Sequence, residues 1–203
     1  MKNWTKLAGE ESINKTLAAL KANGINALVV ENGEAAKKKV FELLPLGAEV
    51  MTMSSVTLDS LNISKEINES GKYNSVRKKL MSMDRKTQGL EMQKIGAAPE
   101  WAVGSVHAVT ENGEVMIASN TGSQLGPYAY GASHVIWVVG TQKIVKDIDE
   151  AVDRIYEYCL PLESEKLKKL YGIPSNVSKK LTISKEIRKD RITLIFVKEV
   201  LGF

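Results

Sequence analysis

The sequence predicts an α/β fold with a mainly parallel sheet and a β-hairpin around residues 106–118. The first half of the chain alternates helix-like and strand-like periodicity, which indicates parallel strands joined by crossover helices. Short apolar runs between turn signals are typical of strands buried on both faces. An Asn-Gly pair between two apolar runs is a strong hairpin signal. At 203 residues the chain is long enough for one sizeable core, and we expect a single domain over residues 1–203.

The individual elements follow from local patterns. Helical spacing of apolar residues predicts helices at residues 10–23, 34–44, 64–69, 74–95 (in two pieces), 147–159 and 163–171. Uninterrupted apolar runs predict strands at residues 25–30, 48–53, 134–139 and 192–197. Pro161 is expected to end the helix that opens at Asp147, and Tyr156 is expected to face inward. Met81, Met83 and Met92 are expected to fill gaps in the core, because methionine is flexible.

The composition excludes several classes of protein. With 6% aromatic residues and scattered lysines, the net charge of +4 does not indicate a nucleic-acid partner. No apolar run approaches the ~20 residues of a membrane span, and the first twelve residues lack the apolar core of a signal peptide. We therefore expect a cytoplasmic protein without a membrane partner. The single cysteine, Cys159, excludes an internal disulfide and a cysteine-clustered metal or iron–sulfur site within this chain.

Small polar residues gather in three segments, 54–57, 110–113 and 120–124. The first and the third follow a predicted strand, and the second forms the turn of the predicted hairpin. Free backbone N–H groups and hydroxyls at strand ends suit a carboxylate or phosphate. Ser54 is also expected to cap a helix, and Lys143 lies just beyond a strand, where it either neutralises an anion or is a solvated loop lysine. We expect these segments to meet in one cleft that binds a small anionic metabolite. The candidate ligand-binding residues are Ser54, Ser55, Thr57, Thr110, Asn112, Gly113, Asn120, Thr121, Gly122, Ser123, Gln124 and Lys143.

Glu111 and His107 are the candidate catalytic residues. A desolvated carboxylate can act as a nucleophile, although Glu-Asn-Gly is also what a hairpin turn favours. His107 precedes the turn and could act as a base, because histidine is largely neutral at pH 7. His134 opens an apolar strand and fits a core position better. Two histidines without clustered acidic partners do not indicate a metal site.

Several segments, in order and spacing, resemble the LUD family of lactate-utilization proteins. The strings that carry the resemblance are AEVMTMSSVTL, NSVRKKLMSMDRKTQG, VGSVHAVTENGEVMIASNTGSQL and YAYGASHVIWVVGTQKIVKDIDEAVDRI. The resemblance implies a three-layer α/β/α fold similar to glucosamine-6-phosphate isomerases, ribose-5-phosphate isomerases and CoA transferases. In related CoA transferases a glutamate of a Ser-Glu-Asn-Gly motif forms an acyl intermediate, and this chain has Thr-Glu-Asn-Gly with Glu111.

The resemblance also implies a role in the oxidation of L-lactate to pyruvate, beside partner subunits that carry iron–sulfur clusters. The chain resembles the cluster-free lactate utilization protein C, so we expect no directly bound cofactor and clusters only on partners. Two other functions stay open. One is a CoA transferase or sugar-phosphate isomerase that uses Glu111, and the other is a non-catalytic scaffold for an iron–sulfur oxidoreductase complex. A homodimer also stays open.

Overall fold

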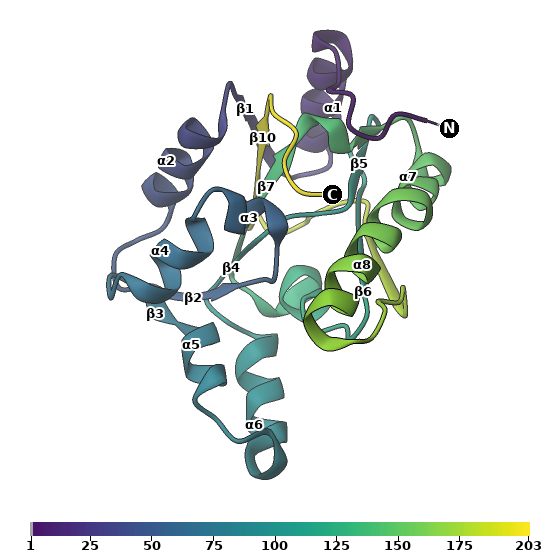
Figure 1. Cartoon of the computed structure of the whole chain (residues 1–203). Helices are drawn as coiled ribbons and strands as arrows, with labels where there is room; N and C mark the ends of the chain where they lie inside the picture. Colours follow the sequence, from purple (N-terminus) through teal and green to yellow (C-terminus); the bar gives the residue numbers. More distant parts are fainter. Residues whose placement is uncertain (1) are drawn as a thin grey trace.

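The computed structural model describes residues 2–203, and its first half alternates helices and strands as the sequence predicts (Figure 1). The order is α1 (Glu10–Ala22), β1 (Asn26–Val30), α2 (Gly33–Leu43) and β2 (Glu49–Thr52). Helix α2 begins where the Asn32 side chain accepts a hydrogen bond from the Ala35 N–H, which satisfies one of the free donors of its first turn. The predicted helix–strand alternation is confirmed.

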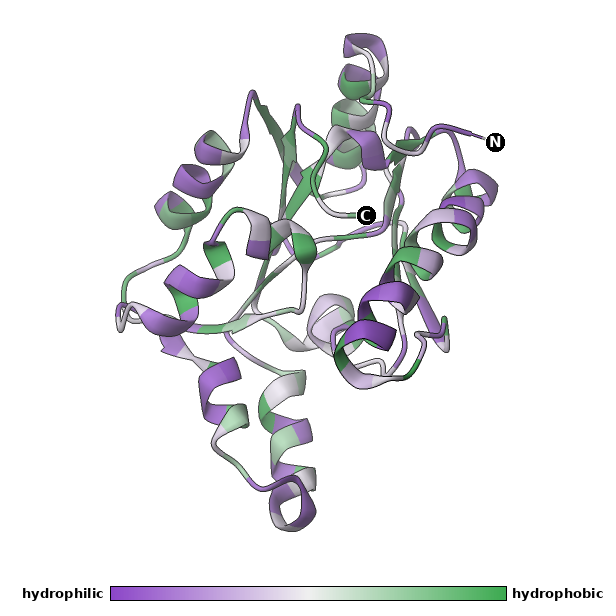
Figure 2. Cartoon of the chain, in the orientation of Figure 1, coloured by the Kyte–Doolittle hydropathy of each residue, from purple (hydrophilic) through white to green (hydrophobic). Residues whose placement is uncertain are grey.

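Six parallel strands form the central sheet, in the order β1-β10-β7-β4-β2-β3. The further strands are β3 (Asn74–Ser75), β4 (Trp101–Gly104), β7 (His134–Gly140) and β10 (Ile192–Val197). The central strands β7 and β10 are almost wholly apolar, because both faces of each are buried. Colouring by hydropathy shows these strands as the apolar centre of the molecule (Figure 2). The predicted α/β class with a mainly parallel sheet is confirmed.

Layers of different kinds cover the two faces of this sheet. Helices α2, α3 (Val56–Ser60) and α4 (Ile63–Glu69) pack on one face, against side chains such as Ile136. The opposite face, which includes Trp137, is covered by α1, by the start of α5 (Val76–Met81) and by a smaller sheet. Helix α7 (Ile148–Arg154) packs on the outer side of that smaller sheet. The molecule therefore has helices on both sides of a mainly parallel sheet, with a four-stranded sheet added to one side.

The four-stranded sheet has the order β8-β5-β6-β9 and contains the predicted hairpin. Its strands are β5 (Ala108–Thr110), β6 (Val115–Ser119), β8 (Ile144–Val145) and β9 (Lys179–Ile183). Gly113 in the hairpin turn has φ of +79°, and a Cβ there would lie 2.7 Å from main-chain atoms of Ala19 and Leu20. Only glycine allows both this φ and the close approach of the turn to α1.

One bent helix replaces the two separate helices that the sequence predicts after residue 147. It runs through α7, a π-helical turn η3 (Ile155–Cys159) and α8 (Leu160–Tyr171) without a break. The prediction that Pro161 ends a helix is wrong. Within the π turn the Leu160 N–H bonds to the Ile155 carbonyl, five residues back. This wider turn accommodates a proline ring that would clash in a regular α-helix. Tyr156, expected to face inward, is exposed.

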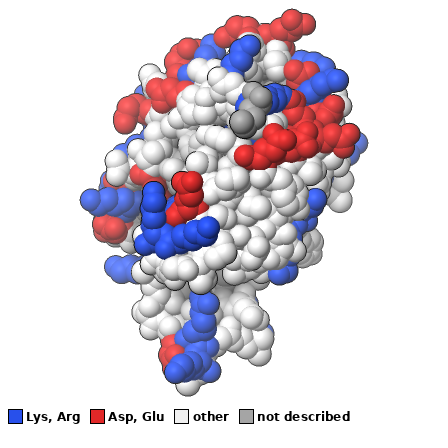
Figure 3. Space-filling model, turned by 45° about the vertical axis from the view of Figure 1, so that its right-hand side comes forward, with Lys and Arg blue, Asp and Glu red and all other residues white. Residues whose placement is uncertain are grey.

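Helices α5 and α6 (Arg85–Ala97) project from the body as an arm (Figure 1). None of the residues in α6 is buried, and Met81 at the end of α5 is 80% exposed, so its expected place in the core is wrong. Residues 74–97 hold six of the chain's 28 Lys and Arg but two of its 24 Asp and Glu. The rest of the chain is therefore electrically balanced, and basic side chains gather at the tip of the arm (Figure 3).

A buried arginine fixes a second π turn, η1 (Pro127–Gly131), beside the arm. Arg191 is 3% exposed, and its guanidinium donates to the carbonyls of Pro127, Tyr128 and Ala132 at 2.8, 2.9 and 2.9 Å. It also pairs with the Glu186 carboxylate at 2.6 Å. Carbonyl groups in η1 and just after it thus find a partner inside the protein. No helix within residues 2–203 is long and apolar enough to cross a membrane.

Candidate functional site

A cavity of about 260 Å³ lies between the central sheet and the helix formed by η3 and α8. Its wall comes from the segment after β2, from the link between β4 and β5, from the loop after β6, and from η2 (Thr141–Lys143) beyond β7. The strands of a parallel sheet end together at one edge, so the loops that follow β2, β4 and β7 meet there.

Lys143 is the only lysine in the wall that is fully buried, with 2% of its surface exposed. Its Nζ donates to Ser105 Oγ, the Val106 carbonyl and the main-chain oxygen of Phe203, each at 3.2 Å, and to Thr57 Oγ1 at 3.4 Å. None of these four acceptors is a side-chain carboxylate. Burial, assisted by the nearby charge of Arg154, lowers the pKa of Lys143 to about 7.

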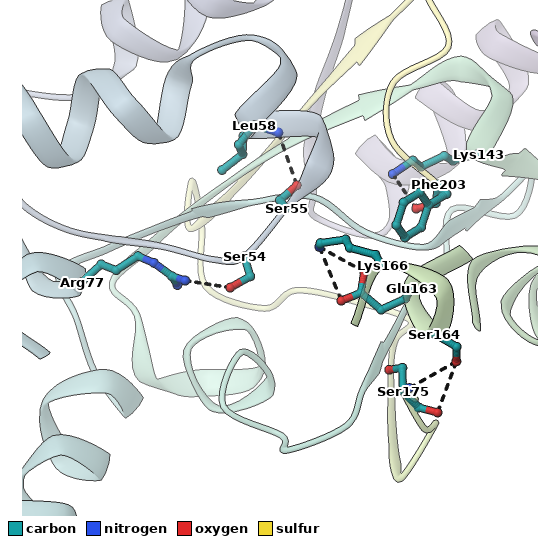
Figure 4. Close-up of polar contacts among 10 residues, drawn as sticks. All are labelled: Ser54, Ser55, Leu58, Arg77, Lys143, Glu163, Ser164, Lys166, Ser175 and Phe203. Carbon is teal, nitrogen blue, oxygen red and sulfur yellow. Dashed lines mark hydrogen bonds and ion pairs between the residues drawn. The ribbon is translucent and has the colours of Figure 1, made fainter. Parts of the chain in front are cut away.

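The segment Leu201–Phe203 reaches Lys143 because residue 202 is glycine. Gly202 has φ of +60°, and a Cβ there would lie 2.5 Å from Thr57 Oγ1 and 3.6 Å from Lys143 Nζ. The Thr57 hydroxyl and the Gln142 amide donate to the Leu201 carbonyl at 3.2 and 3.0 Å. This segment therefore closes one side of the cavity, as the contact between Lys143 and Phe203 shows (Figure 4).

His107 contributes a neutral imidazole to the wall. Its Nδ1 accepts the Ala118 N–H at 3.1 Å, so the proton of the neutral ring resides on Nε2. Burial, together with the charges of Lys143 and Arg154, lowers the pKa of His107 to about 3. The ring therefore stays uncharged at neutral pH and can donate one hydrogen bond from Nε2.

Arg154 and Cys159 are joined behind this wall by the π turn. Arg154 Nη1 donates to the His107 carbonyl at 2.7 Å and contacts Cys159 Sγ at 2.9 Å, while its Nε and Nη2 have no protein partner. Residues five apart share a face in a π turn but not in an α-helix. Burial raises the pKa of the Cys159 thiol, which keeps it protonated despite the arginine. The sequence interpretation missed Arg154, although an arginine between the apolar-face residues Ala151 and Ile155 was a usable signal.

Charged side chains at the rim also contribute to the electrostatic potential in the cavity. Arg77 donates to Ser54 Oγ at 2.9 Å and to the Thr52 carbonyl at 3.3 Å, and within residues 2–203 no carboxylate pairs with it. Glu163 pairs with Lys166 at 3.2 Å across one turn of α8. Arg77 and the Glu163–Lys166 pair lie on different sides of the opening (Figure 4). With Lys143, the lining holds three cationic side chains and one carboxylate.

Two of the three predicted segments meet at this cavity. Ser55, rather than Ser54, caps α3 by accepting the Leu58 N–H at 3.4 Å, while Ser54 binds Arg77. The loop Asn120–Gln124 faces the same space from β6, and the Gln124 amide donates to the Ala118 carbonyl at 2.8 Å. The predicted residues that line the cavity are Ser54, Ser55, Thr57, His107, Asn120, Thr121, Ser123, Gln124 and Lys143. Gly122, with φ of +89°, shapes the loop without lining it.

The third segment, Thr110–Gly113, lies elsewhere, so the expectation of a common cleft is wrong for it. Glu111 accepts hydrogen bonds from Ser12 Oγ and Lys15 Nζ, both at 2.8 Å, on helix α1. The Asn23 amide donates to the carbonyls of Asn112 and Gly113 at 3.0 and 3.2 Å. The side chain of Thr110 accepts the Glu114 N–H at 3.0 Å within the turn. These contacts attach the hairpin to α1, away from the cavity. His134 stacks on Trp101 with ring centroids 4.3 Å apart, in keeping with the expected structural role.

We expect Glu111→Gln to leave ligand binding unchanged and to lower the free energy of unfolding by less than ~1 kcal/mol. Glutamine keeps an acceptor for Ser12 but loses the charge that pairs with Lys15, and pairs this exposed contribute little. Thermal unfolding and a ligand titration of the variant check this. A tenfold loss of affinity, or an acyl adduct on Glu111 after incubation with acyl-CoA, would contradict the placement of the site.

A family model described as the LUD domain matches residues 13–200. The chain belongs to the LUD-domain family. Membership supports a role related to lactate utilization in general. The cavity of this LUD domain is bounded by residues 51–203, nearly all of them inside the matched region.

A solved structure supports the fold of this LUD domain. A crystal structure of a DUF162 family protein from Deinococcus radiodurans has a TM-score of 0.56 and 12% identity, and the match covers 95% of this chain and 99% of that one. The structure of eIF2B beta from Chaetomium thermophilum has a TM-score of 0.39 and 13% identity, over 71% of this chain and 46% of that one. A comparison with curated proteins found no match. At these identities the first likeness concerns the fold alone.

Proposed function

We propose that this LUD-domain protein binds a small organic acid of the lactate and pyruvate class in the cavity beside Lys143. The observation that supports this most directly is the buried Nζ, whose acceptors include no side-chain carboxylate. A buried ammonium group that no carboxylate side chain neutralises is costly, and a bound anion lowers that cost. Arg77 and Lys166 at the rim add to the positive potential, and one carboxylate, Glu163, offsets part of it.

The polar groups of the wall suit a 2-hydroxy or 2-oxo acid. Hydroxyls of Thr57 and Ser105 and the Nε2–H of His107 offer hydrogen bonds to a hydroxyl or carbonyl oxygen. Within a cavity partly shielded from water, each of these contacts is stronger than at an open surface. The volume of about 260 Å³ corresponds to about nine water molecules, so a three-carbon acid fits with a few waters.

In the same proposal, the chain acts as an accessory subunit in the oxidation of L-lactate to pyruvate. Electrons leave the substrate through partner subunits that carry iron–sulfur clusters, and this chain supplies the organic-acid site. Within residues 2–203, no three His, Cys, Asp or Glu side chains come together as they would around a metal ion. Reconstitution with cysteine-rich partners tests this role. A rate of lactate oxidation that does not change when the chain is added would contradict it.

Calorimetric titration with L-lactate and with pyruvate tests the binding site. We expect Lys143→Met to weaken binding on the order of 10–100-fold, because a charge-assisted hydrogen bond contributes about 1.5–3 kcal/mol. Lys146→Met is the matched control, since Lys146 is three residues away and its side chain is 82% exposed. Ligand should also raise the melting temperature of the wild type through mass action. Equal affinities for the wild type and Lys143→Met would overturn the proposed site, and the absence of any shift would favour the scaffold.

A further inference from the structure

The surroundings of Lys143 Nζ differ from those of an ordinary buried lysine. Buried lysines are normally paired with a carboxylate, which holds them as ammonium ions. Here the acceptors are the hydroxyls of Thr57 and Ser105 and the main-chain oxygens of Val106 and Phe203. Neutral hydroxyls can hold an amine as well as an ammonium ion, because a hydroxyl both donates and accepts.

The amine form is accessible at physiological pH. Burial lowers the pKa of Lys143 to about 7, and Arg154 acts in the same direction. Both the amine and the ammonium form are therefore populated at neutral pH. A lysine desolvated in this way, next to another cationic group, is the usual form of an amine nucleophile toward carbonyl compounds.

We infer that Lys143 Nζ forms an imine with the carbonyl carbon of a 2-oxo acid bound in this cavity. The inference rests on the proposed function, since the acid must first bind there. It assigns to Lys143 a covalent role and narrows the ligand to acids that carry a carbonyl group next to the carboxylate.

The covalent step balances without an oxidant or a reductant. The Nζ lone pair forms a bond to the carbonyl carbon, and the electron pair of the C=O bond moves to oxygen. One amine proton passes to that oxygen, and the hydroxyl of Ser105, which contacts Nζ, can relay it. A second proton from the nitrogen accompanies the departing oxygen as water, which leaves a C=N bond. Reversal by water releases the acid unchanged.

The cavity also offers hydrogen-bond donors to the carboxylate of such an acid. Arg77 uses one hydrogen bond each to Ser54 Oγ and the Thr52 carbonyl, so the remaining donors of its guanidinium are free for a ligand. Lys143 and Arg77 approach the cavity from different sides (Figure 4). A 2-oxo acid presents its electrophilic carbon and its charge on adjacent atoms. With its carbonyl carbon at the amine, such an acid directs its carboxylate into a cavity whose wall includes the Arg77 guanidinium.

Borohydride trapping tests this inference on the full chain. The protein is incubated with pyruvate and sodium borohydride, digested, and analysed by peptide mass spectrometry. We expect a reduced, stable adduct on Lys143 that saturates with pyruvate concentration and exceeds the labelling of exposed Lys146 by at least tenfold. L-Lactate, which lacks the carbonyl carbon, is the matched control and should leave Lys143 unmodified. The experiment uses the wild-type protein, so its result does not depend on whether a variant folds.

The outcomes separate the inference from the proposed function. If pyruvate raises the melting temperature but borohydride traps no adduct on Lys143, the imine is overturned and the binding site stands. Equal labelling of Lys143 and Lys146 also overturns the imine, because it reports the general reactivity of lysines. If pyruvate neither shifts the melt nor forms an adduct, the proposed function and the imine both fail.

Discussion

Replacing Arg191 with alanine is expected to lower the free energy of unfolding by ~3–5 kcal/mol, because it removes one partner of a buried ion pair. The guanidinium and the Glu186 carboxylate lie 2.6 Å apart, and both are almost fully buried at the side chain. Burial alone raises the pKa of Glu186, but hydrogen bonds from Arg188 and Arg191 outweigh it, so the net pKa lies below the ordinary value. Without Arg191 that carboxylate is left in the interior without its counter-charge.

The same substitution removes a donor from three main-chain carbonyls, of which that of Pro127 keeps the Ala132 N–H as a partner. Pro127, Tyr128 and Ala132 all accept hydrogen bonds from Arg191, and these carbonyls lie in or next to the π turn η1. Urea unfolding followed by tryptophan fluorescence measures the loss. Arg188→Ala is the control, because that side chain is exposed, and it should change stability by no more than ~0.5 kcal/mol. A loss below ~1 kcal/mol for Arg191→Ala would show that the turn does not depend on this arginine.

Lys143→Met is expected to raise the free energy of unfolding at pH 6 by about 1–4 kcal/mol while it weakens ligand binding. Replacing a buried ion pair with apolar residues of similar volume is often neutral or stabilising by up to this amount, and an ammonium group without a carboxylate side chain has less to offset its burial. Methionine fills the same space and requires no hydrogen-bond acceptors, although four oxygens lose their donor. A residue that destabilises the fold and is needed for binding is characteristic of functional sites.

The sign of the pH dependence follows from the lowered pKa of Lys143. The folded chain releases this proton near pH 7, whereas an unfolded lysine keeps it to about pH 10.4. Between these values the unfolded state binds more protons, so wild-type stability rises with pH by up to ~1.4 kcal/mol per unit from this group. Methionine does not titrate, so the stability of Lys143→Met has no pH dependence from this position. His107 and Cys159 also have shifted pKa values in the folded chain, but both residues are present in the wild type and the variant, so the measured quantity is the difference between the two proteins at each pH.

The difference in free energy of unfolding between Lys143→Met and the wild type should therefore shrink as the pH rises from 6 to 9. Urea unfolding of the wild type, Lys143→Met and Lys146→Met at each pH measures it. Lys146→Met should follow the wild type throughout. A difference between wild type and Lys143→Met that does not change with pH would show that Lys143 keeps its proton in the folded chain.

The periodicity of the sequence was sufficient to predict the central strands of the sheet, but not strand β9 or the exposed arm. Strands such as β7 and β10 are long apolar runs, and their burial on both faces leaves a clear pattern. Strand β9 was missed because four of its five residues are not buried and its pairing with β6 depends on the hairpin. Met81 was misplaced because an exposed arm and a buried helix share the same spacing of apolar residues.

The candidate site was predicted where it depends on loops that follow strands, and missed where it depends on tertiary contacts. Ser55 and Lys143 were found because the parallel strands β2 and β7 bring their ends to one edge, and Asn120 because a polar loop follows the hairpin strand β6. Glu111 was misjudged because a carboxylate in a turn looks the same whether it faces a ligand or helix α1. Arg154 was missed because its contact with Cys159 exists only in a π turn, which a period of 3.6 residues does not reveal.

Because of the π turn η3, the two halves of one helix also pack against different parts of the molecule. A π turn is an α-helix with one inserted residue, so α8 is rotated by about 100° from the position that an uninterrupted helix would give it. Helix α7 presents Ala151 to the small sheet, whereas α8 presents Glu163 and Lys166 to the cavity. A single inserted residue has thus redirected the second half of the helix without disturbing the first. Insertion or deletion at η3 is accordingly a route by which the rim of this cavity could diverge while the core beneath it stays the same.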